Sequence, residues 1–162
     1  VVLDDTYKEY LFTFKDIHAQ TDNTYLQFNF SADSGSNYNV RKTSTVFSSY
    51  HNENGNSTDL SYRGGVNAGL AQSTAFQNIT SPDNMSSDDD HIFAGTFTVF
   101  NPSSTTFVKH YMSHSSFNNV SNHTINAFMA GYGNTTSAVD AVQFKFNSGN
   151  IDAGDICLYG IA

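Results

Sequence analysis

The chain has 162 residues, a formal charge of −8 and a single cysteine. This length fits one domain, and so acidic a balance argues against nucleic-acid and anionic-membrane partners, which require clustered Lys and Arg. Cys157 stands alone, which excludes an intrachain disulfide and the disulfide-rich class of secreted domains. No apolar run reaches the roughly 20 residues that cross a bilayer, so we expect no membrane insertion.

The first half of the chain shows period-two alternation of apolar and polar residues, which predicts β-strands. Tyr10, Phe12 and Phe14 share one face of the first such segment. The only helix candidate is the segment 66–72. Strands are predicted at 9–17, 25–32 and 44–51, with short ones near Leu60 and Phe76.

The second half continues the alternation, and Gly, Asn, Asp and Ser mark the turns between segments. Strands are predicted at 91–100, 105–114, 123–132, 141–147 and 155–161. Short strands at this spacing favour an all-β fold, an antiparallel β-sandwich of the jelly-roll-like kind. Because no repeat or linker divides the chain, we expect one sandwich domain over residues 1–162.

Two of the predicted strands, 123–132 and 155–161, carry apolar residues on both faces. A sandwich strand needs only one buried face, so a second cover is expected, and the simplest cover is another copy of the chain. Two alternatives stay open: an interior strand within one chain, or an ordinary, modestly apolar outer face. The residues expected at an oligomer interface are Cys157, Tyr159, Ile161, Phe128 and Tyr132.

Residue types that catalyse reactions or bind metals form no recognised pattern in this chain. Three carboxylates at 88–90 precede His91, but their spacing lacks the alternating ligands of a calcium loop and is typical of a solvated loop. His110 and His114 lie in a predicted strand, where four residues span roughly 13 Å, too far to share one ion held at about 2 Å. No nucleophile elbow or phosphate-binding loop occurs. We therefore expect a non-enzymatic protein with no catalytic residue, no metal site and no cofactor.

Two residue pairs in polar loop regions are candidates for contact with a receptor glycan. They are Tyr50–His51 and Tyr62–Arg63. Aromatic rings beside hydrogen-bonding neighbours suit sugars, since a ring offers an apolar face and its neighbours offer polar groups. The alternative is that these are ordinary loop residues.

Three stretches of the chain resemble a family of short virion proteins from marine tailed bacteriophages, including cyanophages. They are YLFTFKDIHAQTDNTYLQFNFS, FTVFNPSSTTFVKHYMS and GYGNTTSAVDAVQFKFNSGNIDAGDICLYGI. The resemblance covers nearly the whole chain from about Tyr7 onward. Its most specific part is the terminal SGNIDAGDICLYGI, because a similar segment ends the polypeptide in these phage proteins.

This resemblance implies the C-terminal β-sandwich of a tail-fibre or capsid-appended protein, a kind of module that is commonly a homotrimer. The expected location is the exterior of a phage particle, on the tail or the capsid surface. The expected partners are other copies of the chain, other virion proteins and a host-surface glycan. We expect the chain to lack the N-terminal segment that attaches such a module to the virion. A purely structural capsid-decorating protein and a carbohydrate-binding module of a secreted protein remain alternatives.

Overall fold

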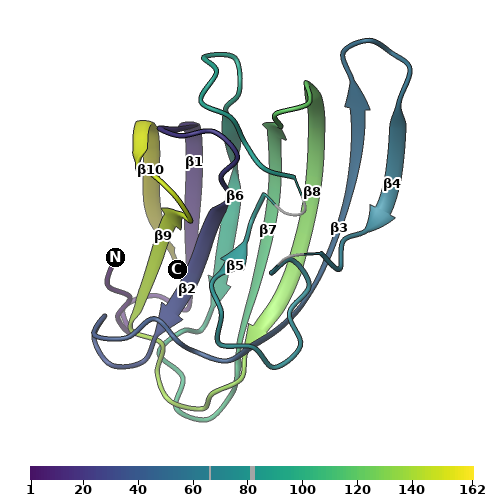
Figure 1. Cartoon of the computed structure of the whole chain (residues 1–162). Coiled ribbons are helices and arrows are strands. Elements are labelled where there is room, and N and C mark those ends of the chain that lie inside the picture. Colours follow the sequence, from purple (N-terminus) through teal and green to yellow (C-terminus); the bar gives the residue numbers. More distant parts are fainter. Residues whose placement is uncertain (66, 81–82) are drawn as a thin grey trace.

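The residues described by the computed structural model, 1–65, 67–80 and 83–162, form ten β-strands in two antiparallel sheets (Figure 1). The larger sheet has the order β10-β1-β6-β7-β8-β3-β4, and the smaller sheet has the order β5-β2-β9. The strands are β1 (Glu9–Ala19), β2 (Leu26–Ser31), β3 (Lys42–Asn52), β4 (Thr58–Tyr62), β5 (Gln77–Asn78), β6 (Phe93–Phe100), β7 (Lys109–Asn118), β8 (His123–Gly133), β9 (Ala141–Phe146) and β10 (Ile151–Ile161).

The predicted antiparallel β-sandwich is confirmed, and every predicted strand is present. The short strands expected near Leu60 and Phe76 correspond to β4 and β5. The helix prediction is wrong for residues 67–72, where Asn67 and Gln72 have positive φ, a conformation that ends any right-handed helix. Residue 66 lies outside the described residues. The described part of the chain holds no helix long and apolar enough to cross a membrane.

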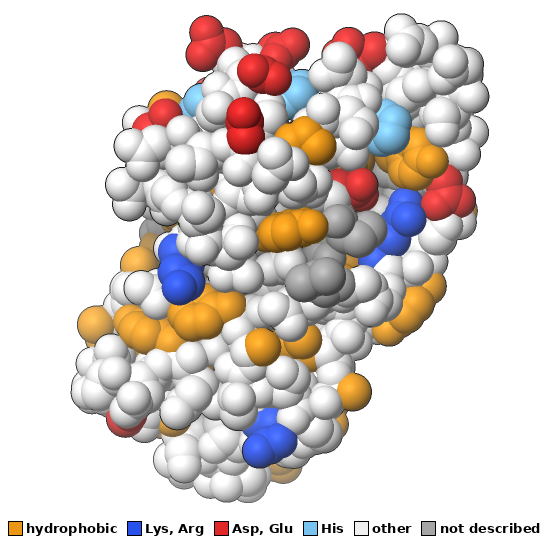
Figure 2. Space-filling model, in the orientation of Figure 1, with side chains coloured by type: hydrophobic (Ala, Val, Ile, Leu, Met, Phe, Trp, Pro, Cys, Tyr) orange, Lys and Arg blue, Asp and Glu red, His pale blue; other side chains and the backbone are white. Residues whose placement is uncertain are grey.

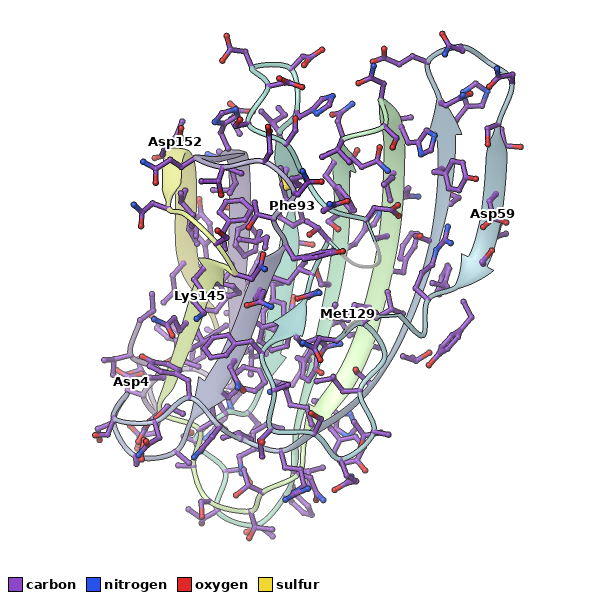
Figure 3. The ribbon with its side chains drawn as sticks, viewed as in Figure 1. Asp4, Asp59, Phe93, Met129, Lys145 and Asp152 are labelled. Atoms are coloured by element: carbon purple, nitrogen blue, oxygen red, sulfur yellow. The ribbon has the colours of Figure 1, made fainter. Side chains whose placement is uncertain are left out.

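Aromatic rings fill the space between the two sheets (Figure 3). Strand alternation sends Phe97 and Tyr111 of the larger sheet inward, where they meet Phe28 of the smaller sheet. The Phe28 ring centroid lies 4.6 Å from that of Phe97 and 5.1 Å from that of Tyr111, in the edge-to-face geometry that aromatic pairs prefer. Phe144 of β9 meets Phe12 of β1 in the same way. The smaller sheet therefore covers β1, β6 and β7.

The described parts of the loop after β4, residues 63–65 and 67–76, pack beside β3. The Lys42 backbone N–H donates to the Ser73 carbonyl at 2.8 Å. At the end of this loop Gln77 of β5 accepts a hydrogen bond from the buried Tyr111 hydroxyl at 2.5 Å. The two sheets are thus joined by polar contacts on this side as well as by the aromatic core.

Strand β10 forms an edge of the larger sheet, where it pairs with β1 (Figure 1). Pairing with β1 sets Leu158 opposite the core residue Phe12, and Tyr159 opposite Leu11 on the other face. The predicted division of apolar residues between two faces is confirmed. Tyr159 and Ile161 are 47% and 40% exposed, so the described part of the chain leaves the second face of β10 largely uncovered.

Acidic side chains gather at one end of the molecule, around the loop that precedes β6 (Figure 2). Asp88, Asp89 and Asp90 are all exposed there. Asp22, from the β1–β2 connection, joins them by accepting a hydrogen bond from the Ser87 N–H at 2.8 Å. The predicted solvated loop at 88–90 is confirmed.

Candidate functional site

The side of the larger sheet that faces away from the smaller sheet, hereafter the outer face, is the strongest candidate for a functional surface. The alternate residues of β6, β7, β8 and β3 that point outward include no Asp, Glu, Lys or Arg, although the chain holds 15 acidic and 7 basic residues. Exposed Phe47, Met112 and Phe128 stand on these strands instead. The charged residues of the chain therefore lie away from the middle of the outer face.

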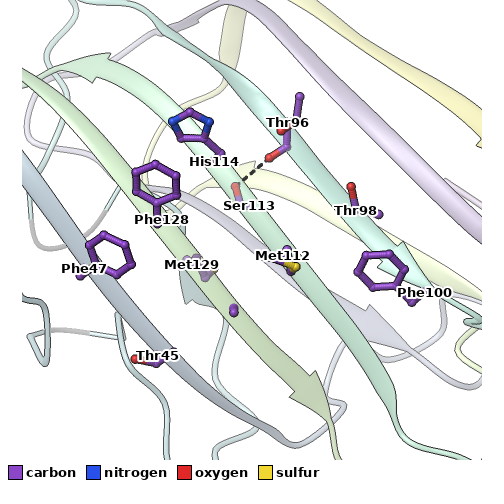
Figure 4. Close-up of a pocket in the computed structure, with 11 residues that line it drawn as sticks. Thr45, Phe47, Thr96, Thr98, Phe100, Met112, Ser113, His114, Phe128 and Met129 are labelled. Atoms are coloured by element: carbon purple, nitrogen blue, oxygen red, sulfur yellow. Dashed lines mark hydrogen bonds between the residues drawn. The ribbon is translucent and has the colours of Figure 1, made fainter.

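One register row on the outer face forms a ladder of stacked rings (Figure 4). His114 of β7 is paired with Phe128 of β8, which is paired with Phe47 of β3. The ring centroids of His114 and Phe128 lie 4.2 Å apart at an interplanar angle of 9°, and those of Phe128 and Phe47 lie 5.1 Å apart at 13°. The full row, from edge to edge of the sheet, is Cys157, Thr13, Thr96, His114, Phe128, Phe47 and Tyr62.

A shallow trough of about 390 Å³ runs beside this ladder (Figure 4). Small residues of the next register row, Thr98, Ala130 and Thr45, line it on three strands, and Met112 projects between them. A second hollow adjoins it on the far side and is lined by Phe100, His110 and Tyr132 among others. Hereafter the outer trough denotes these two hollows together. Apart from His110 and His114, its lining is apolar and hydroxylic, and it contains no Asp, Glu, Lys or Arg.

The sheet beneath the outer trough is held by a buried polar contact. Burial raises the pKa of the Tyr111 hydroxyl above its ordinary value, so the hydroxyl stays protonated and donates to Gln77. Gly131 on the neighbouring strand leaves room for this hydroxyl, because a Cβ at that position would lie 2.5 Å from the oxygen. The hydrogen bond of Tyr111 therefore holds in place the part of the sheet from which the outward residues of β7 and β8 project.

All five residues predicted at an oligomer interface lie on the outer face. Cys157, Tyr159 and Ile161 lie at one edge, on β10, and Phe128 and Tyr132 lie on β8, with β1, β6 and β7 between them. Phe128 and Tyr159 are exposed, whereas Cys157 is half-buried. The structure brings the two groups onto one surface, and their burial by a partner subunit stays a prediction.

The four predicted receptor contacts are not loop residues, with the exception of Arg63. Tyr50 and His51 lie within β3, in agreement with the strand predicted at 44–51, and Tyr62 ends β4. The Arg63 guanidinium lies 5.8 Å from the Tyr50 ring centroid and 3.2 Å from an oxygen of Asp59.

Tyr50 and Arg63 contact other residues of the chain, whereas His51 and Tyr62 are exposed. The Arg63 Nε–H also donates to the Ser48 hydroxyl at 2.7 Å, so Arg63 is engaged within the chain. The Tyr50 ring stacks on His123 at 4.6 Å. His51 and Tyr62 are exposed, and Tyr62 belongs to the ladder row of the outer face. A receptor contact at these positions stays a prediction.

The histidines and carboxylates considered for metal binding are placed apart. His110 and His114 point outward from β7 at separate register rows. His91 is buried, its ring nitrogens 2.5 Å from the Ser86 hydroxyl and 3.1 Å from the Asn122 amide oxygen. In the described ranges no three His, Cys, Asp or Glu residues are grouped so as to hold a metal ion.

Several outer-face residues were not assigned to a site from the sequence. Phe47, Phe100, Met112 and His114 lie on the strand faces opposite to their buried neighbours. Counting the second face of each strand separately would have found them. Their alignment into a ladder could not have been found, because it depends on strand order and register.

Comparisons with known protein families, with curated proteins and with solved structures found no match to this chain.

Proposed function

We propose that this chain is a non-enzymatic structural module on the exterior of a tailed-phage virion, and that its copies assemble through the outer face. The observation that carries the assembly is the part of the outer face on β6, β7, β8 and β3, which has no Asp, Glu, Lys or Arg and exposes Phe47, Met112 and Phe128 on three adjacent strands. The virion setting rests on the resemblance of the chain to phage proteins, above all in residues 148–161. Other virion proteins attach the module to the particle, on the tail or on the capsid.

A second copy of the chain suits the outer face better than a charged partner does. Interface cores are enriched in aromatic residues and Met and depleted of charge, which is the composition of this surface. The formal charge of −8 lies mainly elsewhere, so two such faces can approach without confronting like charges. The resemblance makes a homotrimer the expected assembly.

The assembly can be tested by light scattering coupled to size-exclusion chromatography at micromolar concentration. The wild-type chain is expected to elute with three times the monomer mass. Phe128→Asp, which places a charge in the middle of the ladder, is expected to give a monomer, since an unpaired buried charge costs several kcal/mol per subunit.

The matched control is Phe107→Asp. Phe107 is as exposed as any phenylalanine in the chain but lies in the β6–β7 loop, outside the sheet. This variant is expected to keep the wild-type mass and the wild-type circular dichroism. A monomeric wild type would overturn the assembly, and so would a Phe128→Asp protein that is folded and still trimeric.

The second candidate function is recognition of a host-surface glycan, favoured by the lining of the outer trough. Thr45 and Thr98 supply hydroxyl groups, and Phe100 and Tyr132 supply rings within the outer trough, the combination that a neutral sugar requires. Saturable binding on a glycan array, lost in Thr98→Val and kept in Thr106→Val, would support it. The absence of saturable binding would count against it.

The virion setting needs a separate experiment. Cryo-electron microscopy of an intact particle is expected to locate the module on the tail or on the capsid surface. Its presence in a secreted protein beside a catalytic domain would instead favour a carbohydrate-binding module.

A further inference from the structure

Two polar side chains that the proposed function does not use, those of Lys42 and Asn29, meet in the interior beside β3. Both residues have no exposed surface. The Lys42 amine donates a hydrogen bond to the side-chain oxygen of Asn29 and another to the Val40 carbonyl at 3.0 Å. No carboxylate of the described chain forms an ion pair with it. A buried ammonium ion without a counter-ion is costly, so this environment favours the neutral amine.

The Lys42 amine is therefore a nucleophile at neutral pH. Burial lowers the pKa of Lys42 to about 7, so a large part of the amine is unprotonated under physiological conditions. The amine lies 5.9 Å from the centroid of the Phe28 ring, at the margin of the aromatic core. Lysines become reactive nucleophiles in this kind of desolvated setting.

The Asn29 side chain is held as an acyl group that such an amine can attack. Its NH₂ group donates to the carbonyls of Tyr38 and Thr74, at 2.6 Å and 3.0 Å. Its oxygen accepts from the Phe30 backbone N–H at 2.9 Å as well as from Lys42. The N–H donor polarises the amide carbonyl and faces the position where negative charge would develop on attack.

We propose that Lys42 and Asn29 react with one another to form an intramolecular isopeptide bond. The lone pair of the Lys42 Nζ attacks the Asn29 Cγ, and a C–N bond forms. One Nζ proton passes to the Asn29 Nδ2, the Cγ–Nδ2 bond breaks, and ammonia leaves. No oxidant, reductant or metal is needed, and the product is a secondary amide.

The bond would tie β2 of the smaller sheet to β3 of the larger sheet, across a sequence separation of 13 residues. A chain with a single cysteine has no intrachain disulfide to perform this task. Among the described residues no carboxyl group hydrogen-bonds to the pair to shuttle the proton, and general acid–base assistance is worth about 10²–10⁴-fold in rate. The linkage is therefore expected to accumulate slowly after folding rather than during it.

The chain also contains a matched lysine that should not react. Lys109 is equally devoid of exposed surface, and burial lowers its pKa too. Its amine, however, donates only to the backbone carbonyls of Phe107 and Thr135, at 2.8 Å and 3.2 Å. Because no side-chain amide is among its hydrogen-bond partners, Lys109 is not expected to have an acyl acceptor.

The test is the intact mass of the purified full chain, followed over time at mildly alkaline pH. We expect a loss of about 17 Da, the mass of ammonia, and tandem mass spectrometry should find the peptide containing Asn29 joined to the one containing Lys42. Lys42→Arg, whose guanidinium cannot form the amide, should retain the full mass. Lys109→Arg should lose ammonia as the wild type does.

The rate of mass loss gives a second measurement on the same samples. It should rise from pH 6 to pH 8 and then level off, following the neutral fraction of an amine with a pKa of about 7. Succinimide formation at Asn54–Gly55 also releases ammonia, but that loss would persist in Lys42→Arg and map to another peptide.

Two results would overturn the proposal. One is a wild-type chain that keeps its full mass on prolonged incubation. The other is a gain of about 1 Da at Asn29, which would mean that water and not the Lys42 amine attacks the amide.

Discussion

The side chain of His18 makes the stability of the folded chain depend on pH. One ring nitrogen lies 2.7 Å from an Asp152 oxygen, and the other lies 3.2 Å from the Asp88 carbonyl. Both partners are acceptors, so the protonated ring, which donates from both nitrogens, fits them best. The hydrogen bond with Asp152 raises the pKa of His18 above its ordinary value, and the Asp88 carbonyl adds to this effect.

The pair should stabilise the fold only at the lower end of the physiological pH range. Because the folded-state pKa of His18 is raised, its contribution is fully present below the unfolded value of about 6.5 and is lost as pH rises through the folded value. Asp152→Asn should therefore lower the free energy of unfolding near pH 6 by up to about 1 kcal/mol, the range of partly exposed ion pairs. Near pH 8.5 it should have little effect. Urea titrations at the two pH values measure this difference.

The control for this prediction is Asp155→Asn, an exposed carboxylate of the same strand that is paired in register with Lys15. This pair contains no histidine, so the variant should give the same change at both pH values. Equal destabilisation of Asp152→Asn at the two pH values would contradict the assigned role of His18.

At the scale of the element, β10 depends on a bulge where it pairs with β1. Gly154 has a φ of +102°, and a Cβ there would lie 2.4 Å from the Asp16 carbonyl oxygen. Asp16 itself has a positive φ, and the register shifts between Lys15 and His18. The residues on either side of the bulge can pair only if this position has no side chain.

Gly154→Ala should therefore destabilise the chain by about 2–3 kcal/mol, combining backbone strain with a clash against a neighbouring strand. Gly55→Ala is the matched control, because Gly55 also has a positive φ but a Cβ there meets no atom within 4 Å. It should cost about 1 kcal/mol, the strain alone. Denaturant midpoints of the two variants measure the difference, and equal losses would rule out a tight bulge.

The elements also show what the sequence can and cannot predict. Alternation located the strands and divided the residues of β10 and β8 between two faces, because that pattern depends only on a strand's own side chains. Alternation also placed Tyr50 and His51 in the strand predicted at 44–51, whereas the polar residues around them suggested a loop. It assigned a helix to 66–72, whereas the described residues 67–72 form a loop whose Ala68 and Leu70 are buried beside β3.

For the whole molecule, the missing information was the order of the strands. The outer-face ladder joins β7, β8 and β3, and β3 lies far earlier in the chain than the other two. The pairing of Asn29 with Lys42 likewise depends on the way in which the connection after β2 crosses to the larger sheet. The ladder and the contact between Asn29 and Lys42 both join residues that are distant in the sequence, and the alternation of residues along one strand carries no information about such contacts.

Cys157 gives a means of testing assembly at the scale of the whole molecule. It lies on the outer face of β10, in the same register row as Phe128 but four strands away. At about 4.8 Å between strands the two positions are about 19 Å apart. A substitution at Phe128 therefore cannot change the reactivity of the Cys157 thiol by direct contact. A change in that reactivity reports whether a sister copy covers the face.

If copies assemble across the outer face, the half-buried Cys157 thiol should be protected in the oligomer and accessible in the monomer. Alkylation by a maleimide should be at least about tenfold faster in Phe128→Asp than in the wild type, because protection follows the equilibrium between assembled and free chains. Phe107→Asp should react at the wild-type rate, and dilution of the wild type should accelerate the reaction. Equal rates in the wild type and in Phe128→Asp, at concentrations where the wild type is assembled, would mean that the interface does not extend from β8 to β10.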